Sequence, residues 1–160
     1  MPLRLDLLRH GEALPAGVDG DDARRLSPRG ERDLERLASH LARLGWHPER
    51  AFSSPLLRAR ESARIALGRI QPTVWVAVME ALRPGGEPEE VVAALAAEGG
   101  SAGHVLMVGH QPLLGELAAF LTDGPGPGLA PGSLVRIEFM DVPAAGGGAL
   151  RWRIQPEDCD

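Results

Sequence analysis

Short apolar runs typical of β-strands alternate with longer amphipathic segments along most of this sequence. The strand candidates are residues 3–9, 50–53, 73–78, 104–109, 133–139 and 149–154, and the helix candidates are residues 28–44, 55–68, 88–98 and 112–122. Strands that alternate with helices favour a mainly parallel sheet covered on both faces. We therefore expect an α/β fold, a three-layer α/β/α sandwich with a mainly parallel central sheet. The last two runs are separated by Gly146 to Gly148, which predicts an antiparallel hairpin at an edge.

The helix candidates share one kind of start signal. Each contains a proline at or next to its first position, where the missing N–H is no loss and the fixed φ suits a helix. Ser27 and Ser54 precede two of these prolines, so their hydroxyls can cap the first free amides. The stretch 124–132, GPGPGLAPG, is rich in Gly and Pro and predicts a surface loop.

Length and composition restrict the classes of protein that this chain can belong to. A chain of 160 residues suits one compact domain with a single core, and we expect residues 1–160 to form it. The net charge of -5 argues against a general nucleic-acid binder, and the absence of lysine excludes a P-loop. No apolar run approaches the roughly 20 residues that span a bilayer. With one cysteine, Cys159, and no signal-peptide pattern, we expect a cytoplasmic protein with no nucleic-acid or membrane partner.

Polar residues follow three of the predicted strands at the point where each strand ends. The first strand ends on Arg9 and is followed by His10 and Gly11. The second strand leads into a helix whose first turn holds Arg58, and the fourth strand is followed by His110. In open α/β sheets the ligand crevice lies at the carboxyl ends of the strands. We therefore expect these side chains to meet at one site.

The predicted site contains the groups that phosphoryl transfer needs. Arg9 and Arg58 carry guanidinium forks that bind phosphate oxygens bidentately and stay charged at any working pH. Gly11 would allow a backbone amide to approach the oxygens closely. One neutral histidine can attack phosphorus as a nucleophile, and the other can donate to the transferring oxygens. The sequence lacks the H-x-x-x-H and C-x-x-C spacings of zinc sites, so we expect no metal and no cofactor.

Each of these residues also has a purely structural interpretation. The histidine at position 10 could be an ordinary loop residue, and the one at position 110 could cap a helix. Arg58 could form a surface ion pair that contributes little to stability. Their coincidence at three strand ends favours a site. We expect His40 and His47 to be surface residues, while the pattern leaves the role of His104 open.

Three motifs in collinear order resemble those of the histidine phosphatase superfamily, which has the phosphoglycerate-mutase-like fold. They are LLRHGEA at 7–13, SSPLLRARESA at 53–63 and VGHQPLLGEL at 108–117. The compact length and the G-H-x-P-L-L-G form are most similar to SixA-type protein phosphohistidine phosphatases. This resemblance implies that His10 is the nucleophile that becomes phosphorylated. It also implies that Arg9, Arg58 and His110 complete a phosphate site that holds no metal.

The proton donor is the position that the resemblance leaves open. Family members that act on alkyl phosphates usually carry a Glu or Asp after the third strand, where the candidates here are Glu80 and Glu87. Glu80 aligns with a family E-x-L-x-P pattern, although it could equally be a solvated carboxylate. An alkoxide leaving group needs a proton from the enzyme, whereas an imidazole with a conjugate-acid pKa of about 6.5 departs with much less help.

We therefore expect a metal-independent phosphatase that acts on phosphohistidine in a signalling or phosphotransfer protein. The first alternative is a phosphatase of small phosphomonoesters such as sugar phosphates, which would require Glu80 or Glu87 as a working acid. The second is a module that binds phosphorylated proteins without turnover. The presence of His10 argues against that module, because binding alone needs the arginines but no nucleophile.

Overall fold

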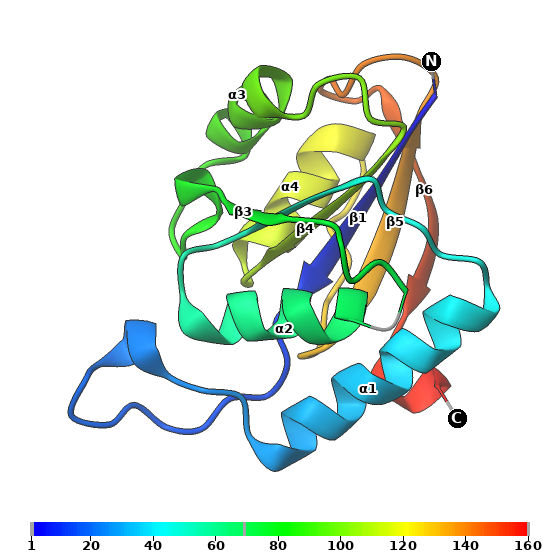
Figure 1. The fold of residues 1–160 in the computed structure, drawn as a ribbon. Coiled ribbons are helices and arrows are strands. Elements are labelled where there is room, and N and C mark those ends of the chain that lie inside the picture. The colour runs from blue at the N-terminus through cyan, green and yellow to red at the C-terminus, as the bar shows by residue number, and fades with distance from the viewer. Residues whose placement is uncertain (1, 69, 160) are drawn as a thin grey trace.

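A six-stranded sheet with the order β3-β2-β4-β1-β5-β6 forms the centre of the molecule (Figure 1). The computed structural model describes residues 2–68 and 70–159. The strands are β1 (Leu3–Arg9), β2 (Arg50–Ser53), β3 (Val76–Val78), β4 (His104–Gly109), β5 (Leu134–Phe139) and β6 (Gly148–Ile154). β1 to β4 run parallel to one another, and β5 is antiparallel to both of its neighbours. The mainly parallel sheet and the edge hairpin are both confirmed.

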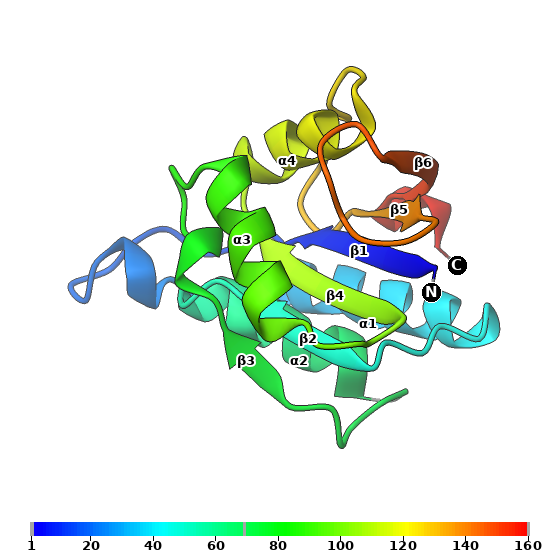
Figure 2. The same cartoon turned by 90° about the horizontal axis from the view of Figure 1, so that it is seen from above.

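Helices cover both faces of this sheet. They are α1 (Pro28–Arg43), α2 (Leu57–Gly68), α3 (Pro88–Glu98) and α4 (Leu113–Thr122), with short 3-10 helices η1 (Asp21–Ala23), η2 (Glu80–Leu82) and η3 (Pro156–Asp158). Seen from above in Figure 2, α3 and α4 lie on one side of the strands and α1 and α2 on the other. The fold is therefore the predicted three-layer α/β/α sandwich.

Some predicted boundaries differ from the structure for identifiable reasons. Ser27 caps α1 as expected, since its Oγ accepts from the Gly30 amide at 3.0 Å. The second helix begins at residue 57 rather than 55, because Ser54 Oγ accepts from the Leu56 amide at 3.1 Å and holds a turn ahead of it. The third strand covers only residues 76–78 instead of 73–78, and α4 begins one residue later than predicted. Both differences fall at element ends, where sequence patterns are weakest.

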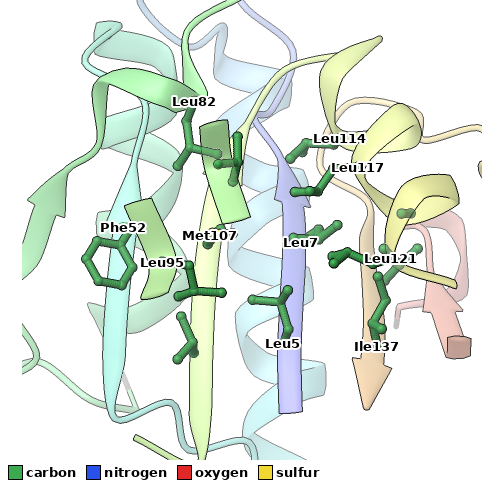
Figure 3. Close-up of a cluster of buried hydrophobic side chains, with 14 of the residues drawn as sticks. Leu5, Leu7, Phe52, Leu82, Leu95, Met107, Leu114, Leu117, Leu121 and Ile137 are labelled. Atoms are coloured by element: carbon green, nitrogen blue, oxygen red, sulfur yellow. The ribbon is translucent and has the colours of Figure 1, made fainter. Parts of the chain in front are cut away.

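Two apolar clusters attach the strands to the helix layers. Figure 3 shows the cluster between the sheet and α3 and α4, in which Leu5 and Leu7 of β1 belong to one group with Leu117 of α4. On the other face Leu8 of β1 belongs to a second cluster with Leu34 of α1. Leu5 and Leu7 on one face of β1 and Leu8 on the other are fully buried, so helices cover the strand on both faces even though it also contains the charged Arg4 and Asp6. This packing holds the carboxyl end of β1, and with it Arg9 and His10, on a rigid support.

A buried polar cluster lies along β1 within the sheet. The Asp6 carboxylate accepts from Trp46 Nε1 at 2.6 Å and from Arg136 Nε and Nη2 at 2.8 and 2.9 Å. His104 Nε2 lies 2.6 Å from the same carboxylate, and Arg136 stacks over the ring of Trp152. His104, whose role the sequence left open, is thus a core residue. Of the two histidines expected at the surface, the one at position 47 is exposed and the one at position 40 is half-buried.

Candidate active site

Two histidine rings lie close together at the carboxyl ends of adjacent strands. His10 follows β1 directly and His110 follows β4, and these strands are neighbours in the sheet. The centroids of the two imidazole rings are 5.0 Å apart, with the ring planes tilted by 56°. His110 is buried, and His10 is half-buried. Residues one hundred positions apart in the sequence therefore form one site.

Two arginines bring positive charge to this pair. Arg9 is the last residue of β1, and Arg58 lies in the first turn of α2. Arg9 Nη1 donates to the Leu129 carbonyl at 2.7 Å, and Arg58 donates to the carbonyl and the carboxylate of Asp21 at 2.8 and 3.2 Å. The Nε atoms of both arginines are buried and have no hydrogen-bond partner among the described residues. Unpaired buried donors on charged groups favour the binding of an anion.

The same surroundings keep both histidines neutral. Burial lowers the pKa of His10 to about 4, and the charges of Arg58 and Arg9 add to this effect, against an opposing hydrogen bond to Gly11. Burial also lowers the pKa of His110 to about 3, together with the charges of His10 and Arg58. Near neutral pH each ring thus carries one N–H and one free nitrogen.

A backbone carbonyl decides which nitrogen of His10 is free. His10 Nδ1 lies 2.7 Å from the carbonyl oxygen of Gly11, and because a carbonyl can only accept, Nδ1 must carry the proton. The other nitrogen, Nε2, is therefore unprotonated and able to act as a nucleophile.

The role of Gly11 differs from the one that the sequence suggested. Its amide donates to Ser62 Oγ at 3.0 Å, so this amide is already occupied within the protein. A Cβ at this position would lie 2.9 Å from Leu34 and 3.2 Å from the Gly30 carbonyl. The absence of a side chain is thus explained by close packing against α1 rather than by approach to a phosphate.

The comparison with protein families decides which group of proteins this fold and site belong to. Residues 5–84 match the model of the histidine phosphatase superfamily, branch 1. The chain is a member of this superfamily. The matched segment contains Arg9, His10 and Arg58, while His110 lies beyond it.

Individual relatives cover more of this histidine phosphatase. The phosphohistidine phosphatase SixA of Escherichia coli is 28% identical over 157 residues, which are 96% of this chain and 94% of SixA. An uncharacterized protein of Picosynechococcus is 35% identical over 125 residues, 76% of this chain and 74% of its own. Among solved structures, SixA complexed with tungstate superposes with a TM-score of 0.87, at 25% identity and 98% and 99% coverage. The superfamily resemblance inferred from the motifs is confirmed.

The two carboxylates considered as proton donors have different surroundings in this histidine phosphatase. Glu80 opens η2 after β3, and its side chain is 72% exposed and accepts from Arg83 Nε at 2.8 Å. Arg83 also contacts Asp22 at 3.3 Å, so Glu80 belongs to a charged network at the surface. Glu87 is the exposed residue that precedes α3. The role of either residue as an acid stays a prediction.

Sequence reasoning missed two residues beside the site. Asp21 in η1 contacts Arg58, and the nearby Arg24 contributes to the lowered pKa of His10. Both lie in the loop between β1 and α1, which extends away from the sheet in Figure 1. No periodicity in residues 14–25 predicts where this loop lies, so the motif alone could not locate them.

The part of the chain that the structure describes contains neither a metal-binding cluster nor a helix that could span a membrane. Within residues 2–68 and 70–159, no group of three or more His, Cys, Asp or Glu side chains is arranged to hold a metal ion. Over the same residues, no helix has both the length and the apolar character that crossing a membrane requires.

Proposed function

We propose that this histidine phosphatase removes the phosphoryl group from a phosphohistidine of another protein, through a phospho-His10 intermediate and without a metal ion. The observation that carries the proposal is the state of His10. Its pKa of about 4 keeps it neutral, and the Gly11 carbonyl fixes its proton on Nδ1, so Nε2 is a free nucleophile. Arg9 and Arg58 stand beside it with unpaired buried donors.

The reaction has two displacement steps at phosphorus. In the first, His10 Nε2 forms a bond to phosphorus, the P–N bond of the substrate breaks, and the substrate imidazole leaves with the electron pair and takes up a proton from solvent water. In the second, water attacks the phosphorus of phospho-His10, and the P–Nε2 bond breaks to release inorganic phosphate. Arg9, Arg58 and His110 would stabilise the charge on the three transferring oxygens in both steps.

The choice of phosphohistidine rests on the leaving group and on the relatives. An imidazole departs without strong acid assistance, and the candidate acid Glu80 is an exposed carboxylate in an ion pair with Arg83. SixA, which covers nearly the whole chain, is a phosphohistidine phosphatase, and it has been solved with tungstate, a tetrahedral oxyanion. These observations support a phosphorylated protein of a signalling or phosphotransfer system as the substrate.

The test combines two substrates with a variant of the nucleophile. The purified protein is mixed, in the presence of a chelator, with a phosphotransfer domain that carries phosphohistidine and, separately, with a panel of sugar phosphates. We expect rapid release of phosphate from the phosphotransfer domain and slow release from the sugar esters. His10→Ala should abolish turnover but retain tungstate binding, whereas His47→Ala, at an exposed position away from the site, should behave as the wild type.

Other results would point to other functions. Turnover of the sugar phosphates alone would favour a small-molecule phosphomonoesterase that uses Glu80 or Glu87. Binding of tungstate without turnover of either substrate would favour a phosphoprotein-binding module. Retained turnover in His10→Ala would contradict the covalent mechanism.

A further inference from the structure

The hydroxyl of Ser54 connects His110 to the start of α2. Ser54 follows β2, and its Oγ lies 2.8 Å from His110 Nε2. The same oxygen accepts from the Leu56 amide at 3.1 Å. The Ser54 side chain is fully buried and His110 is only 3% exposed, so water cannot replace either contact. Ser54 is therefore placed to influence the chemistry through its contact with His110.

The donors and acceptors around Ser54 Oγ determine the direction of its hydrogen bond with His110 Nε2. If His110 donated from Nε2, the buried hydroxyl proton of Ser54 would have no acceptor among the described residues, since its oxygen already accepts from Leu56. If the hydroxyl donates to Nε2, the hydroxyl and Nε2 are both satisfied, and only the Nδ1–H of His110 is left without a partner among the described residues. Buried polar groups are rarely left unpaired, so the second arrangement is favoured. A neutral His110 then carries its one proton on Nδ1.

We propose that Ser54 is a positioning residue that holds His110 in the tautomer protonated on Nδ1, so that this N–H donates to the transferring phosphoryl group. His110 Nδ1 is buried and has no hydrogen-bond partner among residues 2–68 and 70–159. An N–H there needs an acceptor, and a phosphoryl oxygen held beside His10 and Arg58 would supply it. For the identity of this acceptor, the inference rests on the proposed function.

The tautomer can be measured directly, without turnover. In protein labelled with 15N-histidine, the nitrogen shifts distinguish a nitrogen that bears a proton from one that does not. At neutral pH the wild type should show His110 protonated on Nδ1, and added tungstate should shift that nitrogen. Ser54→Ala should move the proton wholly or partly to Nε2, whereas Ser54→Thr, which keeps the hydroxyl, should retain the wild-type pattern.

Ser53 offers a matched control one residue away. It is also fully buried, but its Oγ donates to the Ser54 carbonyl at 2.8 Å rather than to the histidine. Ser53→Ala should leave the tautomer of His110 unchanged. A general effect of losing a buried hydroxyl would appear in both variants, while the positioning role affects only Ser54→Ala.

Kinetics provide the second measurement. The Nδ1–H of His110 would stabilise charge that develops on the phosphoryl group in the transition state. Ser54→Ala should therefore lower kcat about 10- to 100-fold with little change in KM. Ser54→Thr should retain most of the wild-type kcat. A wild-type His110 protonated on Nε2 would overturn the inference, and so would an unchanged tautomer or kcat in Ser54→Ala. If the wild type turns over no phosphohistidine, the proposed function fails, but the nitrogen shifts still decide the tautomer.

Discussion

Asp6 should contribute more to stability than any single ion pair on the surface of the sheet, and Asp6→Asn tests this. The carboxylate is fully buried and accepts from Trp46 and twice from Arg136, with His104 Nε2 at 2.6 Å. Asparagine has nearly the same volume as aspartate, but it carries no charge. Its NH2 group would also face the N–H donors of Trp46 and Arg136. The substitution therefore removes one partner of a buried ion pair and creates almost no cavity.

The size of the effect follows from this arrangement. Leaving one member of a buried ion pair without its partner costs about 3 to 5 kcal/mol of unfolding free energy. For a chain of this length that corresponds to a decrease in Tm of about 6 to 20 °C. Burial raises the pKa of Asp6, but the hydrogen bonds and charges of Arg136 and His104 outweigh it and hold the pKa below the ordinary 3.8. The ionised carboxylate therefore stabilises the fold fully at a pH above 3.8, the ordinary pKa of Asp. This stabilisation is lost as the pH falls through the lower pKa of the folded state.

Urea unfolding followed by Trp fluorescence and far-UV circular dichroism measures the difference. Glu138→Gln is the control, because Glu138 of β5 forms a single 2.8 Å ion pair with Arg151, and both side chains are at least one-third exposed. That variant should lose less than about 1 kcal/mol. The difference between Asp6→Asn and the wild type should narrow progressively as the pH falls below the ordinary Asp pKa of 3.8, and it should be smallest below the lower folded-state pKa, where the wild-type carboxylate is also neutral. A loss of less than about 1 kcal/mol for Asp6→Asn at pH 7 would refute the reasoning.

Three further predictions concern the site. Glu80→Gln should change turnover of p-nitrophenyl phosphate little but slow alkyl phosphates by about 100-fold if Glu80 is the acid, and equal effects on both substrates would remove it from that role. Asp21→Ala should raise tungstate affinity in calorimetry by up to about five-fold, because the partly exposed carboxylate that competes for Arg58 is removed, whereas weaker binding would show that Asp21 assists the anion. An NMR titration of His10 should have its midpoint near pH 4, with the neutral form above it, and a midpoint above 6 would contradict the nucleophile assigned here.

The ends of the strands were the most predictable part of the molecule. Arg9 ends a short Leu-rich run and His10 follows it, and such a run predicts both a strand and the edge of the sheet at which its carboxyl end lies. Ser27 and the proline after it were sufficient to locate the start of α1, because capping depends on neighbouring residues alone. Local patterns thus predicted the elements, and the rule for parallel sheets predicted that their ends meet.

What the sequence could not predict depends on contacts between distant residues. Asp6 pairs with Arg136 and His104 only through the register of three strands, and that register is not encoded in any one of them. Asp21 reaches Arg58 through a loop without periodicity. Gly11 was interpreted through its backbone freedom, while its actual constraint is the side chain of an approaching helix.

The position of β1 in the sheet has a consequence for when the enzyme can first work. β1 lies between β4 and β5, and its register pairs Arg9 with Gly109 and Leu8 with both Val108 and Leu134. The ribosome makes β1, which the nucleophile His10 follows, more than ninety residues before either of its neighbours. Such long-range pairing is slow to form. The chain loses conformational entropy when distant segments are brought together, and the stabilising contacts form only after that. A nascent chain therefore leaves both edges of β1 unpaired until β4 and β5 have been made, and it can acquire activity only after that point.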